Sequence, residues 1–266
     1  MHVLHKLRFL AILIFLFNQT ILQASETKKD QATILALGME MSNMRNMLAA
    51  YILTGAKISY KRPEERLKNG ILHYENMLST ITKDYPHDEF IQASVKKSLH
   101  AWVNVKGAME LALAKTDLEK LKSAAIWIHG NIRTVIKEMA AMKGYLFKTS
   151  NIENKMALNA SIEIAASAKR LSAHYMMDLW HLNDPTIEKH WKKGMKIYSD
   201  SIEVLQKSPF IKNKKFASNL KSVIKYHHYF EKMWQKSKIF SILIDKKTDI
   251  VFHKAKEMTE IILQSK

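Results

Sequence analysis

Four residues close together in the second half of the chain carry side chains that can bind a small anion. Lys169 and Arg170 supply positive charge, Ser172 supplies a hydroxyl donor, and His174 supplies an imidazole. Arg170 and His174 are four residues apart, so on a helix they share one face. A Lys on an apolar helix face must pair with an acid, bind an anion or extend its ammonium to the edge. An anion site is therefore one of three interpretations of this group.

The rest of the sequence offers little for catalysis or cofactor binding. The chain has no Cys, which excludes disulfides, Cys-based zinc sites, iron–sulfur clusters and thiol catalysis. It has no Gly-rich phosphate loop, no Gly-x-Ser-x-Gly and no kinase motif. We therefore expect that the protein is not an enzyme and holds no cofactor.

Two groups of side chains, one of Met and one of His, have atom types that bind metals. Met39, Met41, Met44 and Met47 have the composition of thioether clusters that bind Cu(I), but Met41 and Met44 fall on an apolar helical seam, where Met fills gaps in a core. The adjacent pair His227–His228 faces different sides of a helix, whereas metal-binding pairs are three or four residues apart. His and Met are also the residues that hold a non-covalent haem, but the sequence indicates no particular pair of them as its ligands. We predict no metal site.

The positive charge of the chain comes mainly from Lys. Lys and Arg total 42 against 25 Asp and Glu, a formal charge of +17, and only six of these cations are Arg. Nucleic-acid readers depend on the bidentate contacts of Arg, so we expect no nucleic-acid partner. The densest basic stretch, 207–225, predicts either a solvated surface or a site for anionic lipid or an acidic partner.

Residues 1–24 have the pattern of a secretory signal peptide. A basic start is followed by the nine-residue apolar run 9–17 and by a candidate cleavage site after Ala24. The run is shorter than the roughly 20 residues that span a bilayer. An uncleaved anchor is the alternative. We expect a soluble periplasmic protein.

The remaining sequence predicts long helices. Apolar residues of the first helix repeat at intervals of three and four, which is the pattern of a bundle seam: Ile34, Leu37, Met41, Met44, Leu48 and Tyr51. Helix starts and stops are predicted by Pro, Gly, Asp and Asn at Thr54–Gly55, Pro63, Pro86–Asp88, Thr116–Asp117, Ser150–Asn151, Asn183–Pro185, Pro209 and Asp245–Asp249. The fold class expected is all-α, with about eight helices.

The order of these segments repeats. Lys68–Tyr74 matches Lys192–Tyr198, and Ser94–Trp102 matches Ser222–Phe230, at offsets of 124 and 128 residues. The pattern predicts a tandem duplication with units at 25–148 and 149–266, each a four-helix bundle. The alignment pairs Lys169 with Met41, on the seam. The alternative is a slightly rotated helix that places Lys169 in solvent.

The first helix of each unit resembles the opening helix of PilJ-like sensory domains. These are the N-terminal domains of type IV pili methyl-accepting chemotaxis transducers, related to the periplasmic domain of NarX-type nitrate/nitrite sensor kinases. In the segment 37–53, Gly38, Met47, Tyr51 and Leu53 keep the family pattern. In the segment 165–175 the Leu-Ser pair is kept as Leu171–Ser172. The resemblance covers both units in helix layout, and about 17 residues in each are similar to the motif.

In the nitrate-binding relatives an Arg of this motif binds the anion at a dimer interface. The corresponding positions here are Lys169 and Met41, and neither offers the planar fork of a guanidinium. The resemblance therefore implies one altered site, in which the two units pack as a pseudo-dimer. Arg45, inside the first motif, completes the candidate ligand-binding residues.

Two functions follow from these patterns. The first is an exported sensory module that binds a small oxyanion such as nitrate or nitrite and acts through a membrane receptor or an envelope protein. The second is a structural or interaction protein of the cell envelope that kept the bundle and lost the ligand site.

Overall fold

The structure, a computed structural model, describes residues 2–114, 116–182, 186–234 and 241–265, with side chains from Glu26 onward except those of Leu179 and Ser241. Over these ranges the chain forms eight α-helices and one short 3₁₀ helix, and no strand. The expected all-α fold is confirmed. The elements are α1 (His2–Gly55), α2 (Pro63–Asp84), α3 (Glu89–Leu113), α4 (Leu118–Thr149), α5 (Lys155–Leu179), α6 (Thr186–Gln206), η1 (Pro209–Lys212), α7 (Lys214–Trp234) and α8 (Ser241–Gln264).

Most of the predicted helix starts are confirmed, with the capping groups in place. Pro63 begins α2. The Asp88 carboxylate accepts a hydrogen bond from the backbone N–H of Ile91 (2.9 Å) at the start of α3. Asp117 accepts one from the backbone N–H of Glu119 (3.2 Å) at the start of α4. These side chains satisfy N–H groups that have no partner inside the helix.

One predicted break is wrong. Asp245–Asp249 lies inside α8, not between helices. The two carboxylates form ion pairs with side chains of other elements instead of capping a helix end. The break predicted at Asn183–Pro185 lies outside the described residues; the next described helix begins at Thr186.

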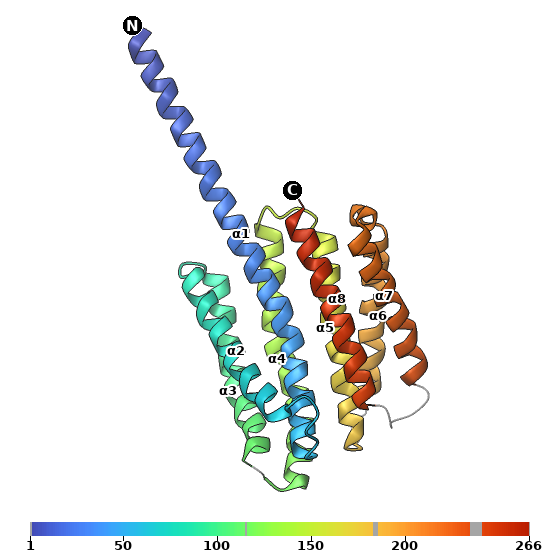
Figure 1. Ribbon diagram of the computed structural model, residues 1–266. Helices are drawn as coiled ribbons and strands as arrows, with labels where there is room; N and C mark the ends of the chain where they lie inside the picture. Colours follow the sequence, from blue (N-terminus) through green and yellow to red (C-terminus); the bar gives the residue numbers. More distant parts are fainter. Residues whose placement is uncertain (1, 115, 183–185, 235–240, 266) are drawn as a thin grey trace.

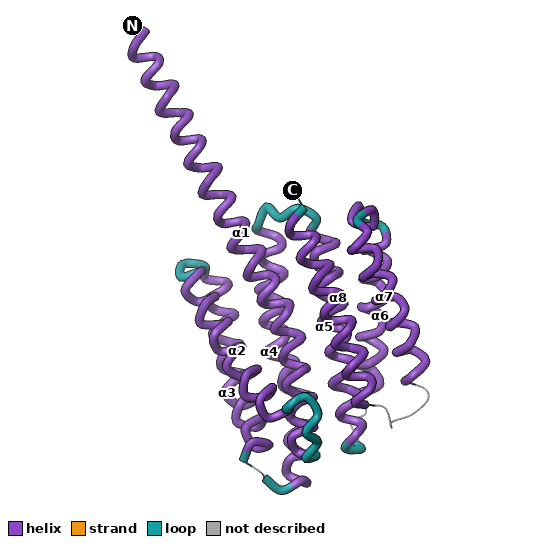
Figure 2. The backbone as a smooth tube through the Cα atoms, in the orientation of Figure 1, coloured by secondary structure: helices purple, strands orange, loops and turns teal. Residues whose placement is uncertain are grey.

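Helices α1 and α5 lie side by side at the centre of the molecule (Figure 1). Helix α1 also contacts α2, α3 and α4, and α5 also contacts α6 and α8. Around these two helices, α2 contacts α3, α3 contacts α4, α6 contacts α7, and α7 contacts α8. Figure 2 shows that the described connections between helices lie at the ends of the molecule.

This central position leaves α1 and α5 with almost no solvent-facing side. From residue 33 to residue 53 in α1, and from 157 to 177 in α5, every side chain is buried or half-buried. The predicted seam of α1 is confirmed, since all six of its residues are at most 4% exposed. Met41, Met44 and Met47 lie in this core. The polar residues of both helices are therefore buried along with the apolar ones.

The two central helices approach closely at Gly38. A Cβ atom added to Gly38 would lie 2.3 Å from Cγ2 of Ile162 on α5, far inside van der Waals contact. A side chain of any size at this position would push the helices apart. Gly107 on α3 contrasts with it, because a Cβ there would meet nothing within 4 Å.

Helix α1 runs without interruption from His2 to Gly55, and its N-terminal part extends beyond the other helices (Figure 1). Over the residues searched, none of the helices combines the length and the apolar character that a membrane crossing requires. The backbone of residues 2–24 is helical, and the signal peptide predicted there stays a prediction.

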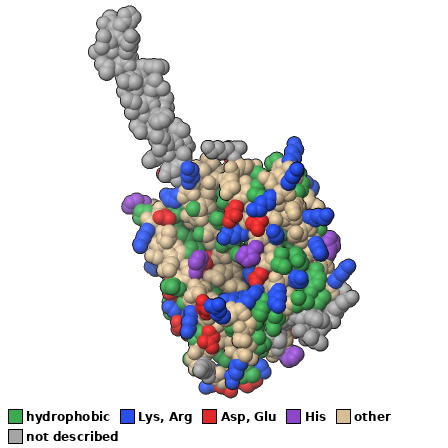
Figure 3. All heavy atoms as spheres, viewed as in Figure 1, with side chains coloured by type: hydrophobic (Ala, Val, Ile, Leu, Met, Phe, Trp, Pro, Cys, Tyr) green, Lys and Arg blue, Asp and Glu red, His purple; other side chains and the backbone are tan. Residues whose placement is uncertain are grey.

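The basic surface is distributed over the molecule. On the face shown in Figure 3, Lys and Arg side chains lie among Asp and Glu side chains over several helices. In the stretch 207–225 the Lys side chains are exposed. Nζ of Lys215 lies 3.6 Å from Oε2 of Glu257. Mixed surface charge of this kind is typical of a solvated face.

Two glycine substitutions test the close approach of α1 and α5. We expect Gly38→Ala to lower the free energy of unfolding by about 1–3 kcal/mol, because the added methyl group overpacks the contact with Ile162. The matched change Gly107→Ala, in an exposed helix interior, should raise it by about 0.5–1 kcal/mol. Urea unfolding followed by circular dichroism measures both. Equal effects of the two substitutions would contradict the close packing at Gly38.

Candidate functional site

Two cavities flank the contact between α1 and α5. The first, here called the ion-pair cleft, has a volume of about 510 Å³ and is lined from α1, α2, α5, α8 and the loop after α1. The second, here called the arginine pocket, has a volume of about 390 Å³ and is lined from α1, α4, α5 and α6. Four of the five residues predicted to bind a ligand line these cavities: Lys169 lines the first, and Arg45, Arg170 and His174 line the second.

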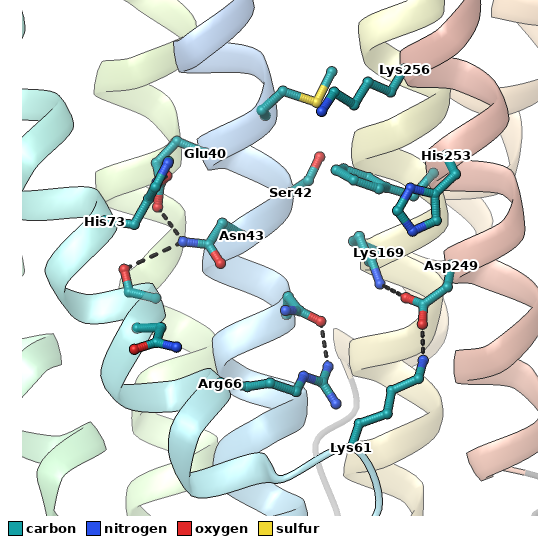
Figure 4. Close-up of a pocket in the computed structure, with 15 residues that line it drawn as sticks. Glu40, Ser42, Asn43, Lys61, Arg66, His73, Lys169, Asp249, His253 and Lys256 are labelled. Carbon is teal, nitrogen blue, oxygen red and sulfur yellow. Dashed lines mark hydrogen bonds and ion pairs between the residues drawn. The ribbon is translucent and has the colours of Figure 1, made fainter.

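The ion-pair cleft contains Lys169. Its Nζ forms an ion pair with Asp249 of α8, and the same carboxylate pairs with Lys61 of the loop (Figure 4). Lys61 Nζ also lies 3.2 Å from Oδ2 of Asp245, which is fully buried. The hydroxyl of Ser172 donates to Oδ1 of Asp245. Lys169 is only 5% exposed, so the alternative of a solvated Lys169 is wrong.

The two carboxylates from α8 are shared among cations of this cleft: Asp249 pairs with Lys61 and Lys169, and Asp245 with Lys61 and Arg66. Burial lowers the pKa of Lys169 to about 8, and the nearby Asp245 carboxylate opposes this shift. Burial alone would raise the pKa of Asp245, but Lys169, Arg66, Ser172 and Lys61 outweigh it and hold that pKa below its usual value. Cations therefore hold the Asp245 carboxylate ionised. The cleft is therefore a network that ties the loop after α1 and helix α5 to α8.

In the arginine pocket, unlike in the ion-pair cleft, Arg45 and Arg170 form no ion pair with a carboxylate among the described residues. Arg45 of α1 is 8% exposed, and its Nη1 donates only to backbone carbonyls, those of Met41 (3.2 Å) and Ala166 (3.4 Å). Arg170 of α5 is half-buried, and its Nη1 atom is buried without a hydrogen-bond partner among the described residues. A buried donor without a partner is costly. Two guanidinium groups from the two central helices thus line one cavity.

The pocket has little negative charge to offset these cations. Five cationic side chains line it, namely Arg45, Arg133, Lys137, Arg170 and Lys193, and Glu163 is the one carboxylate among the described lining residues. Glu163 already accepts a 2.6 Å hydrogen bond from Lys143. Burial lowers the pKa of Arg45 well below its usual value, and Arg170 lowers it further, while Glu163 opposes both. A guanidinium stays charged at neutral pH, so the pocket is electropositive.

Three histidines lie at one side of the arginine pocket. His129 of α4, His174 of α5 and His190 of α6 have ring centroids 5.4, 5.5 and 6.2 Å apart. Burial lowers the pKa of His174 well below its usual value, and His129, Arg170, Arg45 and His190 lower it further. His174 is therefore neutral at physiological pH. Nη1 of Arg133 lies 2.7 Å from Nε2 of His190.

The structure thus brings together three of the five predicted ligand residues. Arg45, Arg170 and His174 line the arginine pocket, and Lys169 and Ser172 lie on the other side of α5 in the ion-pair network. Arg170 and His174 share a face, as their spacing predicted. The partners Asp245, His129 and His190 were not predicted, because they come from other helices and the sequence carries no motif that links them. Glu163 lies on α5 itself, and it was not predicted either.

Comparisons with known proteins add no relative. A scan against protein-family models, a search of curated proteins and a search of solved structures found no match to this chain.

A charge-neutral substitution tests the ion-pair cleft. We expect Asp245→Asn to lower the free energy of unfolding by about 3–5 kcal/mol, because it removes the buried carboxylate that pairs with Lys61 and whose charge offsets that of the buried Lys169. Asp200→Asn is the matched control, since Asp200 forms an exposed pair with Lys196 on one helix, and such pairs contribute at most about 0.5 kcal/mol. Chemical denaturation measures both variants. A small effect of Asp245→Asn would show that the network does not hold α5 to α8.

Proposed function

We propose that this chain is an exported sensory module that binds a small oxyanion, such as nitrate or nitrite, in the arginine pocket and acts through a membrane partner. The proposal includes two tandem four-helix units, 25–148 and 149–266, of the PilJ-like kind, preceded by a signal peptide at 1–24 that directs the protein to the periplasm. The observation that carries it is the pair Arg45 and Arg170, which line one cavity. Among the described lining residues the cavity has one carboxylate, Glu163, and Lys143 already pairs with it.

The charge of the pocket favours an anion. Inside a protein an uncompensated cation is costly, and an anion that enters the cavity offsets that cost. The Nη1 of Arg170 has no hydrogen-bond partner among the described residues, so it can donate to an oxyanion. Guanidinium groups bind the oxygens of planar oxyanions with two parallel hydrogen bonds, which a Lys ammonium cannot do. These properties support Arg170, rather than Lys169, as the main ligand.

The position of the pocket supports a sensory role. Its two central arginines come from α1 and α5, the first helices of the two proposed units, which pack against each other. A ligand between these helices contacts both units at once. Binding can therefore change how the units pack, and a partner that touches both can detect the change. The dimer interface of the resembled receptors corresponds, in this proposal, to a contact within one chain.

Anion titration tests the proposal. We expect isothermal titration of the metal-free protein with nitrate and nitrite to give saturable binding to wild type. Arg170→Gln should weaken it by about 10–150-fold, because charged hydrogen bonds of about 1.5–3 kcal/mol are lost. Lys169→Ala is the control and should keep the affinity of wild type, since Asp249 still pairs with Lys61 in that variant.

A stability measurement separates binding from structure. Without anion, Arg170→Gln should be at least as stable as wild type, because it removes a buried charge that Glu163, already paired with Lys143, offsets only in part. If no anion gave heat, and Arg170→Gln unfolded more easily than wild type, the arginine would have a structural role. The chain would then be an interaction protein of the envelope with a lost ligand site.

A further inference from the structure

The three histidines of the arginine pocket converge from three helices. The ligand nitrogens of His129, His174 and His190 all lie within 4.8 Å of one another. Each histidine is fixed by a different helix, namely α4, α5 and α6, so the cluster depends on the tertiary fold. It is distinct from the adjacent pair His227–His228 that the sequence offered, which lies on α7.

The spacing of the rings fits a tetrahedral metal centre. With Zn–N bonds of about 2.0–2.1 Å and tetrahedral angles, three coordinating imidazoles have ring centroids about 5 Å apart. The observed separations are 5.4, 5.5 and 6.2 Å. Nitrogens bound to one tetrahedral ion lie about 3.4 Å apart, so the proposed site requires the three rings to move closer together on binding.

His174 is the most deeply buried histidine of the cluster, at 3% exposed. Its Nδ1 is buried and has no hydrogen-bond partner among the described residues. This nitrogen is therefore available as a ligand.

Arg133 is a cation that competes with a metal ion for His190. Its guanidinium lies 2.7 Å from Nε2 of His190, and its side chain is exposed, so it can move into solvent when a metal binds. The other cations that face the cluster, Arg45 and Arg170, oppose a divalent ion. An oxyanion bound as the fourth ligand offsets that repulsion, and the same cavity offers room for it.

We propose that His129, His174 and His190 form a site for a divalent transition-metal ion of the zinc class, with its fourth coordination position open to the arginine pocket. An oxyanion held by Arg170 completes the coordination, so metal and anion bind more tightly together than apart. The fourth ligand rests on the proposed anion function; the three-histidine site does not.

Cobalt titration tests the metal site. Full-length protein without a polyhistidine tag is treated with chelator and titrated with Co²⁺, and the intense visible absorption of tetrahedral Co²⁺ is recorded. We expect one ion per chain, displaced by Zn²⁺. His190→Ala and His129→Ala should abolish this spectrum, and His228→Ala, which changes an exposed histidine of α7, should leave it unchanged. Far-ultraviolet circular dichroism checks that each variant is folded.

Two further measurements separate the metal from other roles of the cluster. Arg133→Ala should bind Co²⁺ more tightly than wild type, because it removes a competing positive charge; a purely structural pair of Arg133 and His190 would not give this result. Nitrite should raise the affinity for Co²⁺ by about tenfold or more, and by reciprocity Co²⁺ should raise the affinity for nitrite equally.

The outcomes distinguish the two proposals. Absence of saturable Co²⁺ and Zn²⁺ binding, or a spectrum that survives both His190→Ala and His129→Ala, would overturn the metal site and leave the anion function to the nitrate titration of metal-free protein. Co²⁺ binding that does not respond to nitrite would overturn the oxyanion as fourth ligand. Absence of anion binding with Co²⁺ binding intact would overturn the proposed function and, with it, the oxyanion as fourth ligand, while the three-histidine site would stand.

Discussion

The close packing of α1 against α5 is the constraint on which the rest of the structure depends. The helices meet at Gly38 and Ile162, where there is no room for a further methyl group. Because each of the two helices also has neighbours on its other sides, neither keeps a solvent-facing side over its central part. Every polar residue of these stretches must then find a partner inside the protein.

The two sides of this contact meet that requirement in different ways. On one side α8 supplies Asp245 and Asp249, and the cations of the cleft pair with them. On the other side α4 and α6 supply mainly cations and histidines, and Glu163 is already paired with Lys143. The first side is an internal network that contributes to stability. The second retains positive charge, which is the property that a binding site for an anion needs.

A pocket of this kind has an energetic cost to the free protein. The buried Nη1 of Arg170 and the neutral His174 beside it are arrangements that a purely structural core would replace with apolar side chains. In the proposed function, an oxyanion bound to Arg170 supplies the hydrogen bond that this Nη1 lacks among the described residues. The difference in stability between the free and the occupied pocket is the free energy that a sensory module can use to change the packing of its central helices.

The sequence by itself determined the helices. Pro63, Asp88 and Asp117 mark starts that the structure has, because capping is a local interaction that needs only residues within one turn. The three-and-four spacing also identified the buried seam of α1. Asp245–Asp249 misled the prediction, because an Asp that pairs with a distant Lys looks in sequence like one that caps a helix.

Only the tertiary structure decided which polar residues work together. Lys169 and Arg170 are adjacent in sequence, but on a helix they point about 100° apart, and the neighbours of α5 differ on the two sides. One side meets the carboxylates of α8, and the other meets His129 and His190. Sequence spacing fixes the direction of a side chain within its own helix. The charge that it meets there is set by other helices, distant in the chain, and no local pattern encodes it.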